Sequence, residues 1–495
     1  MLSDNKSMSS TQETNAAATD LDRLAYALVA DLSDSVGFLS SDSAGPRYQE
    51  DWTGAFGAAA PVLRPRTVPA LAETVRRLHR AGLRIVAQGG MSGLVGGGAP
   101  MRGEVVVSLE LLNRIESCDV YGATMTVQAG ATLQAVQEEA ERQGLFYPVD
   151  LGSRGSCTVG GNIATNAGGN RVLQYGMTRA SVLGLEVVLP DGTLVSRMGR
   201  VAKDNAGYDL KQLFIGSEGT LGIVARAVLR LHPLPRQRCT VALGLQDLDQ
   251  VLRALAGCRA DFGPMLTSFE VMWRDFVDFV ARGLGVGRDP FDGACGYVVL
   301  LELSCYDRQP ARDEARIMDA LEALSDSLGT PHVVVAKSLS EAAELWRMRD
   351  ASGEAARHLG AYLSFDVSIP TGELQACLPR IYAGLDAIDP ALRRLTYGHL
   401  GDGNVHLLVG CEGPAAEHVE HLVYHEVMRC GGSISAEHGI GLEKNRVFQS
   451  LYPAAELDAM RRIKLAFDPG AMLGRDRVFG LSRPPSSTRP APELP

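Results

Sequence analysis

The chain has 495 residues, of which 45% are hydrophobic and 21% charged, and its 58 acidic side chains against 48 Lys and Arg give a formal net charge of −10. One hydrophobic core rarely serves more than roughly 250–300 residues, so at least two domains are expected. An acidic chain without a long basic block lacks the clustered cations that nucleic-acid binding needs, and we exclude a nucleic-acid partner.

The apolar segments and the N-terminus do not indicate a membrane-spanning or secreted protein. The longest apolar run, Tyr297–Leu303, is far shorter than the roughly 18 residues that cross a bilayer and is typical of a buried strand. Residues 1–20 lack the basic start and apolar centre of a signal peptide, so we expect a disordered leader on a cytoplasmic protein. The nine cysteines include no Cys-x-x-Cys pair and indicate neither a disulfide framework nor a thiolate zinc site.

Periodicity and turn residues predict the elements of the first half of the chain. Helices are expected over residues 21–33 and 70–82, and strands over residues 84–87 and 104–109. Between residues 125 and 230 we expect further strands, with a hairpin turn at Pro190–Thr193. Pro233 and Pro235 stop both helices and strand pairing, so a domain boundary is expected near residue 235.

Beyond residue 235, predicted helices and strands alternate in the manner of an α+β domain with an antiparallel sheet. The helices are expected over 246–258, 309–328 and 339–358, and the strands over 297–304, 332–337, 361–369 and 405–410. The Pro- and Ser-rich tail over residues 481–495 is expected to be disordered.

Two glycine-rich stretches stand out in the first half. Residues 89–98 contain six glycines in ten positions, and residues 150–170 interleave glycine with hydroxyl and amide side chains. Glycine loses much conformational entropy on folding, so a backbone without Cβ atoms must be needed there. Consecutive backbone amides that approach a phosphate closely are one such need. Two such loops in one domain predict an extended ligand that contains a polyphosphate.

A glycine loop taken alone is more often a tight turn, and this alternative stays open for each stretch by itself. Neither stretch contains Gly-x-Gly-x-x-Gly, and the chain has no Gly-Lys-Ser/Thr. Both the Rossmann fingerprint and the P-loop are therefore absent, and the phosphate must be bound in another way.

The first loop, the run Pro148–Gly176 and the segments Asp204–Leu210 and Phe214–Val224 together resemble the FAD-binding domain of the vanillyl-alcohol oxidase/p-cresol methylhydroxylase superfamily. The resemblance implies that the first loop holds the FAD pyrophosphate and that the second wraps the ribityl chain and the isoalloxazine. The residues that it assigns to the cofactor are Gly89, Gly90, Met91, Ser92, Gly93, Gly96, Pro148, Gly152, Ser156, Gly160, Gly161, Asn162, Thr165, Asn166, Gly168, Gly169, Tyr175, Gly176, Glu218, Gly219, Gly222 and Ile223.

We expect FAD to be bound without a covalent link. Some relatives attach FAD through a histidine in the first loop, where this chain has Met91 and Ser92. A thioether would need a cysteine near the second loop, and Cys157 is available. A free cysteine more often behaves as a small buried hydrophobe, which favours the non-covalent alternative.

Three histidines lie in two compact polar motifs. His399 and His406 flank a Gly-Asp-Gly turn, and Glu437 precedes His438 in a Ser-Ala-Glu-His-Gly segment. Two imidazoles and one carboxylate can form a metal site with an open position, which leaves His438 for proton transfer. A single histidine is more often structural than catalytic, so the spacing alone does not decide.

His-Leu-Gly-Asp-Gly-Asn-x-His followed by Ser-Ala-Glu-His-Gly-x-Gly is similar to the signature of the FAD-dependent D-2-hydroxy-acid dehydrogenases, such as those for D-lactate and D-2-hydroxyglutarate. With the flavin domain, the resemblance covers most of residues 55–480. It implies that His399, His406 and Glu437 bind a divalent metal, usually zinc. It also implies that His438 is the base and that Asn404 contacts the substrate.

The implied reaction oxidises a D-2-hydroxy acid to its 2-oxo acid. The metal lowers the pKa of the 2-hydroxyl, His438 removes its proton, and the C2 hydride passes to FAD. The substrate carboxylate needs a cation with two-pronged geometry, and Arg349 occupies the place of the arginine in the family's Leu-Trp-x-x-Arg. The alternative for Arg349 is an exposed helix arginine.

The chain departs from the family pattern at two places. Members that act on the five-carbon diacid carry a threonine and a lysine where this chain has Gly353 and Ser364, so the partner of a second carboxylate is missing. Near the C-terminus the usual Asn-Pro is replaced by Gly474-Arg475, which affects a contact normally made to the flavin.

The expected organisation is a leader (1–20), a two-subdomain FAD-binding domain (21–235), an α+β substrate and metal domain (236–445), a short helical segment near the flavin (446–480) and a tail (481–495). We expect an electron acceptor such as an electron-transfer flavoprotein or a quinone, no membrane span, and a homodimer. A flavin oxidase that uses oxygen and a non-catalytic flavoprotein remain the alternatives.

Overall fold

The computed structural model describes residues 19–54 and 57–481. The expected leader lies outside the described residues up to residue 18, and the expected tail lies outside them from residue 482. Residues 19–29 are helical and continue into η1 (Ala30–Leu32), which agrees with the first predicted helix.

The chain first builds a four-stranded sheet in the order β1-β2-β4-β3. Its strands are β1 (Val36–Leu39), β2 (Val62–Pro65), β3 (Arg84–Gln88) and β4 (Glu104–Ser108). Helix α3 (Val68–Arg80) joins β2 to β3, and the Thr67 side chain caps it by accepting a hydrogen bond from the Ala70 amide. Two short turns, α2 (Ser41–Ala44) and η2 (Pro46–Tyr48), lie between β1 and β2. The predicted helix at 70–82 and the strands at 84–87 and 104–109 are confirmed.

A five-stranded antiparallel sheet follows in the order β5-β6-β10-β8-β9. Its strands are β5 (Ile115–Asp119), β6 (Thr124–Gln128), β8 (Val182–Val188), β9 (Leu194–Arg197) and β10 (Ile223–Arg230). The helices around it are α4 (Leu133–Arg142), α5 (Val159–Thr165), α6 (Val172–Tyr175), α7 (Thr178–Ser181) and α8 (Lys211–Phe214). A two-stranded ladder pairs β7 (Leu145–Phe146) with β11 (His232–Pro233). The predicted hairpin turn joins β8 to β9, with Gly192 at φ +81°.

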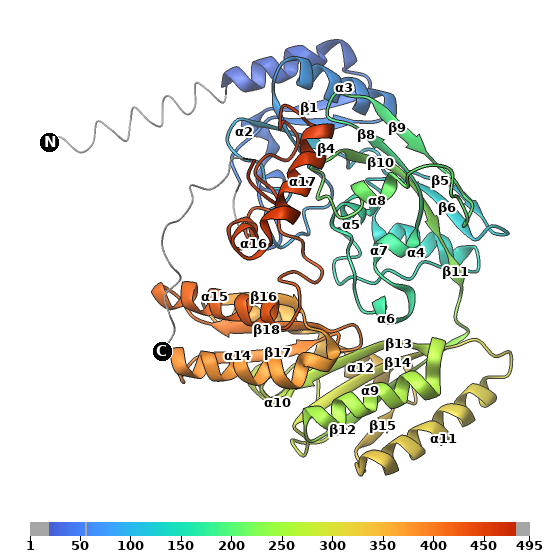
Figure 1. The fold of residues 1–495 in the computed structure, drawn as a ribbon. Helices are drawn as coiled ribbons and strands as arrows, with labels where there is room; N and C mark the ends of the chain where they lie inside the picture. The colour runs from blue at the N-terminus through green and yellow to red at the C-terminus, as the bar shows by residue number, and fades with distance from the viewer. Residues whose placement is uncertain (1–18, 55–56, 482–495) are drawn as a thin grey trace.

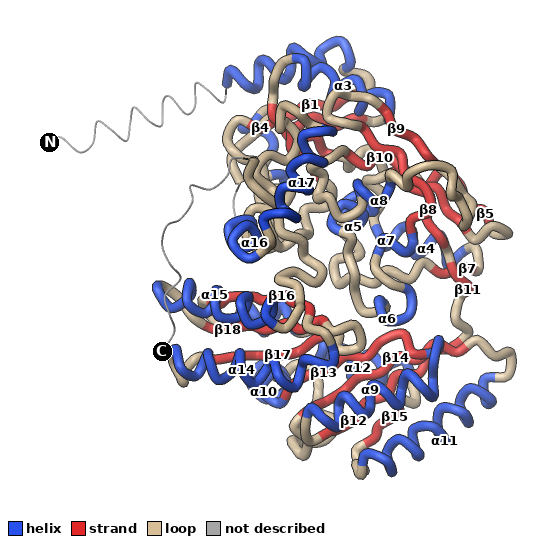
Figure 2. The backbone as a smooth tube through the Cα atoms, in the orientation of Figure 1, coloured by secondary structure: helices blue, strands red, loops and turns tan. Residues whose placement is uncertain are grey.

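The second half contains a seven-stranded sheet in which every pair is antiparallel, as predicted. In spatial order its strands are β15 (Val333–Val335), β12 (Gln237–Leu245), β14 (Tyr297–Cys305), β13 (Leu266–Trp273), β17 (Arg393–Gly398), β18 (Asn404–Gly410) and β16 (Tyr362–Ser368). Figure 2 shows this sheet in the lower part of the molecule, apart from the two sheets of the first half.

Helices cover both faces of this sheet, because alternate strand residues point to opposite sides. One face packs against α9 (Leu248–Phe262), α11 (Pro310–Leu328), α14 (Leu374–Ile388) and α15 (Pro414–Arg429). The other packs against α10 (Arg274–Val277), the π-helical η4 (Asp278–Leu284), α12 (Leu339–Asp350) and α13 (Ser352–His358). The short turns η3 (Gly263–Met265) and η5 (Thr371–Glu373) complete this half. The helix predicted over 339–358 divides at Ala351.

The closing segment returns to the first half of the chain (Figure 1). Helices α16 (Asn445–Leu451) and α17 (Ala454–Phe467) still contribute Phe448 and Leu457 to the second core, but Leu473 is buried in the first. The Ile85 amide donates to the Met472 carbonyl and the Gly474 amide donates to the Ile85 carbonyl, at 2.8 and 2.9 Å. The segment thus lies along β3, directly before the first glycine loop.

A buried ion pair holds this segment in place. Both guanidinium Nη atoms of Arg477 lie 2.9 Å from the two carboxylate oxygens of Glu104, and neither side chain is exposed by more than 1%. Arg477 also donates to the carbonyls of Gly97 and Ala99 in the first loop. The pair therefore ties the C-terminal segment to the loop.

Arg477→Leu is expected to destabilise the fold by about 3–5 kcal/mol, because it leaves the buried Glu104 carboxylate with the Met101 amide but without its cationic partner. Urea denaturation of the purified chain would measure the loss. Arg475→Leu is the matched control, since the Arg475 side chain is 43% exposed and, within the described residues, forms an ion pair with its neighbour Asp476 alone. Equal stability of the two variants would contradict the role of the pair.

Candidate functional site

A cavity of about 920 Å³ lies between the two glycine stretches and one edge of the second half. Its size is near the upper end of cavities that hold small molecules and cofactors. The first half contributes residues of both loops and the segment 218–224, and the second half contributes Asp350–Glu354, Arg357, Glu437 and His438. An extended ligand in this cavity would reach from the glycine loops to the His438 segment.

Most residues that the resemblance assigns to FAD line this cavity. They are Gly89, Gly90, Met91, Ser92, Gly93, Gly152, Ser156, Gly160, Gly161, Asn162, Thr165, Gly168, Glu218, Gly219, Gly222 and Ile223. The other six, Gly96, Pro148, Asn166, Gly169, Tyr175 and Gly176, are not among its lining residues. Asn166 ends α5 in the left-handed conformation, and the Tyr175 hydroxyl bonds that of Tyr306 at 2.8 Å.

The glycines serve two different needs. A Cβ atom on Gly90 would lie 1.9 Å from the Ser156 carbonyl oxygen, so the two loops require this glycine in order to approach each other. By contrast, a Cβ on Gly93 or Gly152 would meet no atom within 4 Å, although both residues line the cavity. The close approach of the loops thus accounts for Gly90, whereas Gly93 and Gly152 border space that a ligand can fill.

Cys157 also lines the cavity, with 3% of its surface exposed. Burial raises the pKa of its thiol, so the nucleophilic thiolate is disfavoured. Met91 occupies the first loop at φ +53°. Gly474 and Arg475 are not among the described residues that line the cavity.

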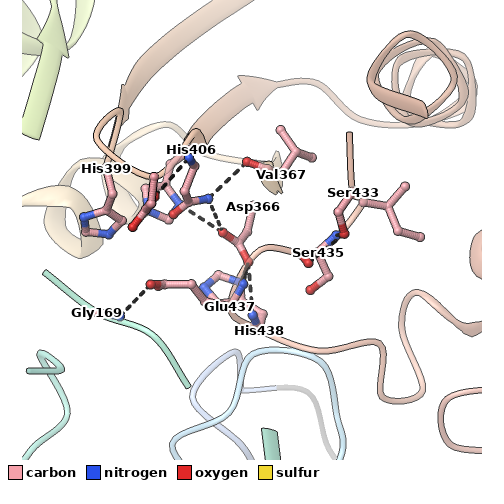
Figure 3. Close-up of polar contacts among 12 residues, drawn as sticks. Gly169, Asp366, Val367, His399, His406, Ser433, Ser435, Glu437 and His438 are labelled. Carbon is pink, nitrogen blue, oxygen red and sulfur yellow. Dashed lines mark hydrogen bonds and ion pairs between the residues drawn. The ribbon is translucent and has the colours of Figure 1, made fainter. Parts of the chain in front are cut away.

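The two histidine motifs meet at one place (Figure 3). His399 follows β17, His406 lies on β18 after a turn in which Gly403 has φ +84°, and Glu437 comes from the loop after α15. One ligand atom of each of the three residues lies within 4.8 Å of the others. Two imidazoles and one carboxylate at this spacing have the donor set of a divalent metal site with an open position.

Glu270 on β13 orients the His399 ring by contacting its Nδ1 atom. Its carboxylate lies 2.6 Å from Nδ1 of His399, and Nε2 on the other side of the ring lies 3.3 Å from an Nη atom of Arg349. Burial opposes the charged form of this imidazole, but the carboxylate outweighs it and raises the pKa of His399 to about 9. A metal ion held by this imidazole would therefore have to displace a proton. Burial lowers the pKa of His406 well below its ordinary value, which favours the neutral ligand form.

Asp366 on β16 is the centre of a second set of contacts (Figure 3). One carboxylate oxygen accepts from the backbone amides of Glu437 and His438, at 2.8 and 3.0 Å. The imidazole Nδ1 atoms of His406 and His438 lie 3.5 and 3.7 Å from the same carboxylate. Asp366 is fully buried, yet these imidazoles hold the pKa of its carboxyl below the ordinary value. The carboxylate thus positions a predicted metal ligand and the predicted base together.

Asp366 also determines which way Asn404 faces. The Asn404 amide nitrogen donates to the Asp366 carboxylate and to the Val367 carbonyl, at 2.8 and 3.1 Å. Since both partners are acceptors, they must face the nitrogen and not the oxygen. The amide oxygen is buried and has no partner among the described residues. Asn404 therefore presents an acceptor, which can meet a hydroxyl proton or a cation but not a carboxylate.

The segment 437–441 is also held by the first half of the chain. Oε1 of Glu437 accepts from the Gly169 amide at 2.6 Å. The Glu218 carboxylate accepts from the amides of Ile440 and Gly441, at 2.8 and 2.7 Å, and burial raises the pKa of its carboxyl. These contacts place His438 at the wall of the cavity that the glycine loops form.

Arg349, the predicted carboxylate anchor, is 6% exposed, so the alternative of an exposed helix arginine is wrong. Its Nε atom donates to Glu270 at 2.8 Å, and one Nη atom lies 3.3 Å from Nε2 of His399. The guanidinium also stacks over the Tyr397 ring. Arg349 thus lies beside the histidine cluster but does not line the large cavity.

Sequence reasoning did not single out Glu270 or Asp366. Each is an acid inside a strand of apolar neighbours, and buried acids are rare unless they are paired. An acid within an apolar strand could have indicated a paired buried carboxylate. The pattern could not identify the partners, because His399 and Glu437 lie 129 and 71 residues away from these acids.

Comparisons with known proteins agree with this geometry. A family model described as "FAD linked oxidases, C-terminal domain" matches residues 234–478, and one described as "FAD binding domain" matches residues 59–197. Over 84% of its length the chain is 37% identical to "D-2-hydroxyglutarate dehydrogenase, mitochondrial" of Bos taurus, of which 76% is covered. It is also 37% identical over 87% of its length to D-2-hydroxyglutarate dehydrogenase of Xanthomonas citri pv. viticola, of which 92% is covered.

Two solved structures share the fold. p-Cresol methylhydroxylase with bound substrate has a TM-score of 0.72 at 16% identity, with 95% of this chain and 98% of that chain covered. An alkyldihydroxyacetonephosphate synthase has a TM-score of 0.67 at 15% identity, with 90% and 84% covered.

The protein is therefore a flavoprotein with the vanillyl-alcohol oxidase/p-cresol methylhydroxylase fold, as predicted. Within that superfamily the chain belongs to the FAD-dependent D-2-hydroxy-acid dehydrogenase family, and it is an FAD-linked oxidoreductase. None of the helices in the described part of the chain is both long and apolar enough to cross a membrane. The predicted cytoplasmic location stays a prediction, since some relatives are named mitochondrial.

Asp366→Asn is expected to speed hydrogen exchange of the Glu437 and His438 amides by about tenfold, because an amide oxygen is a weaker acceptor than a carboxylate. Exchange measured by mass spectrometry on peptides that span 436–439 would show it. Asp275→Asn is the matched control, since the half-buried Asp275 carboxylate also accepts two backbone amides, from Phe276 and Thr396. Unchanged exchange in Asp366→Asn would contradict the positioning role.

Proposed function

We propose that this protein oxidises a D-2-hydroxy acid to the 2-oxo acid, with non-covalently bound FAD and a divalent metal ion such as zinc. The observation that carries the proposal is the placement of His438 at the wall of the glycine-loop cavity, beside the His399, His406 and Glu437 cluster. The curated relatives named D-2-hydroxyglutarate dehydrogenase support the substrate class.

The chain offers suitable groups for both cofactors. The glycine loops and the open space at Gly93 and Gly152 suit FAD, and the buried, protonated Cys157 thiol favours a non-covalent complex. His399, His406 and Glu437 would hold the metal ion through two nitrogens and one oxygen. When bound, the metal would make the 2-hydroxyl more acidic, and FAD would accept the hydride from C2.

The remaining steps, removal of the hydroxyl proton and binding of the substrate, are assigned to side chains of the chain. His438 removes the proton of the 2-hydroxyl, and Asp366 holds the His438 segment in place for this step. Asn404 contacts the substrate through its amide oxygen, since its nitrogen already donates to Asp366 and Val367. Arg349 is the anchor for the C1 carboxylate, and its contact with His399 places that group next to the metal ligands.

We assign cofactor binding to residues 21–235 and substrate and metal binding to residues 236–445. The segment 446–480 returns along β3, where Arg477 bonds the first loop, and so supports the FAD side. An electron-transfer flavoprotein or a quinone as acceptor and a homodimeric state belong to the same proposal. A flavin oxidase is the second candidate, and rapid reoxidation of the reduced flavin by air would identify it.

An anaerobic screen of D- and L-2-hydroxy acids is the direct test. The flavin absorbance of the holoenzyme is expected to bleach with a D-acid and not with its L-enantiomer. A chelator should abolish the bleaching and added Zn²⁺ should restore it, because the metal activates the hydroxyl. If no hydroxy acid bleaches the flavin with or without metal, the protein is a non-catalytic flavoprotein and the proposal fails.

His438→Ala is expected to keep the yellow, FAD-bound protein but to lower turnover by at least about 10²-fold, the usual contribution of a general base. Stopped-flow bleaching with the best D-acid would measure it. His425→Ala on α15 is the control, because His425 is exposed and does not line the cavity. Turnover in His438→Ala that equals the control would remove His438 as the base.

A further inference from the structure

Helices α14 and α15 pack against each other on one face of the seven-stranded sheet. A Cβ atom on Gly384 would lie 2.6 Å from the Leu422 side chain, so the two helices approach closely at this point. One turn away, the Arg380 Nε atom donates to the Glu426 carboxylate at 2.9 Å. Since residue numbers fall along α14 as they rise along α15, the two helices run antiparallel.

The next facing residues are two cysteines, Cys377 on α14 and Cys430 at the end of α15. Both are free thiols. Burial raises the pKa of the Cys377 thiol, and a hydrogen bond between this thiol and that of Cys430 acts in the same direction. Sulfur atoms in such contact need little movement to reach the separation of about 2 Å in a disulfide. The helix pair therefore places two thiols where a disulfide can form.

The surroundings of the two sulfur atoms differ. Cys377 is fully buried, and its thiol donates to the Glu426 carbonyl at 3.7 Å. Cys430 is 9% exposed, and its sulfur accepts a hydrogen bond from an Nη atom of Arg380 at 2.8 Å. The Arg380 side chain is itself 37% exposed, so the Cys430 sulfur lies one side chain away from solvent. Cys430 is thus placed to meet a small oxidant first, with Cys377 behind it.

Positive charge gathers beside the Cys430 sulfur. The Glu426 carboxylate accepts from Arg380 and also lies 3.1 Å from an Nη atom of Arg429. One carboxylate between two guanidinium groups leaves a net positive charge at this place. A guanidinium that donates to sulfur stabilises negative charge on it, and the thiolate is the form of cysteine that attacks peroxides.

The end of α15 is also the start of the loop that leads to residues 437–441. Ser433 exchanges two backbone hydrogen bonds with Ser368 at the end of β16, at 2.8 and 3.0 Å. A Cβ atom on Gly432 would lie 2.2 Å from the Ser368 carbonyl oxygen, so no side chain fits between the loop and β16. A cross-link at Cys430 would therefore act directly before a tightly packed part of this loop.

We propose that Cys430 and Cys377 are a redox pair that a hydroperoxide, such as hydrogen peroxide, oxidises to a disulfide, and that this bond holds the start of the loop to residues 437–441. The Cys430 thiolate attacks one peroxide oxygen, the O–O bond breaks, and a sulfenic acid and hydroxide form. The Cys377 thiol then attacks the sulfenic sulfur, so that an S–S bond forms and water leaves. The two thiols lose two electrons, which reduce the peroxide, and a dithiol reductant reverses the change.

The experiment treats the purified FAD-bound protein, without substrate, with a few equivalents of hydrogen peroxide and maps its cysteines by mass spectrometry of unreduced digests. We expect a cross-linked peptide pair that contains Cys377 and Cys430 and that dithiothreitol separates. The order of reaction is the decisive readout, because Cys118, Cys239 and Cys411 are all more exposed than Cys430.

Variants separate the roles of the side chains. Cys377→Ser is expected to stop at the sulfenic acid of Cys430, which dimedone labels, and Cys430→Ser should leave Cys377 reduced. Arg380→Met should slow the oxidation by about tenfold, because the positive charge beside the sulfur is lost. Oxidation of the wild type should slow hydrogen exchange of the amides of residues 430–433 by at least about threefold, since a cross-link opposes local opening. Cys411→Ala, at the half-buried cysteine after β18, is the matched control and should behave as the wild type.

Four results would overturn the inference. Modification of Cys118, Cys239 or Cys411 before Cys430 would show that exposure decides reactivity, and equal rates in the wild type and Arg380→Met would remove the role of the arginine. A wild type without the cross-linked peptide has no redox pair, and unchanged exchange at 430–433 after cross-linking would show that the disulfide does not hold the loop. None of these readouts requires turnover, so a failure of the proposed function would leave the inference standing.

Discussion

The site depends on three carboxylates that hold one short segment between the two halves of the chain. Asp366 binds the backbone of Glu437 and His438, Glu218 binds the backbone of Ile440 and Gly441, and Glu437 itself reaches the Gly169 amide. A carboxylate that accepts backbone N–H groups makes stronger bonds than a neutral acceptor. These bonds therefore hold residues 437–441 against the cavity wall.

The surrounding structure compensates the buried charges of Glu270 and Asp366. The seven-stranded sheet is covered by helices on both faces. Glu270, Asp366 and His406 lie on its strands, and His399 directly follows β17. Asp366 faces the imidazoles of His406 and His438, and Glu270 faces the imidazole of His399 and the guanidinium of Arg349. Paired in this way, the acids can stay ionised without water, whereas an isolated one would have to take up a proton.

The glycines of the two glycine-rich stretches are needed for two different structural reasons. Some glycines, such as Gly90, are needed because the loops approach each other closely, and others, such as Gly93, leave space at the cavity surface. The closing segment then fixes the first loop through Arg477 and Glu104. The loop that we propose for the cofactor thus also bonds the C-terminal segment through its backbone.

The sequence by itself determined the features that are local: both glycine stretches, the turn between His399 and His406, the Glu437-His438 pair, and the confirmed strands and helices. These features can be predicted because they involve residues that are close in the sequence and share one turn, helix or strand. Strand β13 was missed because it is buried over its whole length, and a continuously buried strand shows no alternation; β17 was missed as well. Only the tertiary structure decided that Glu270 orients His399, that Asp366 joins His406 to His438, and that Cys377 meets Cys430. Those partners lie far apart along the chain, and no local pattern specifies them.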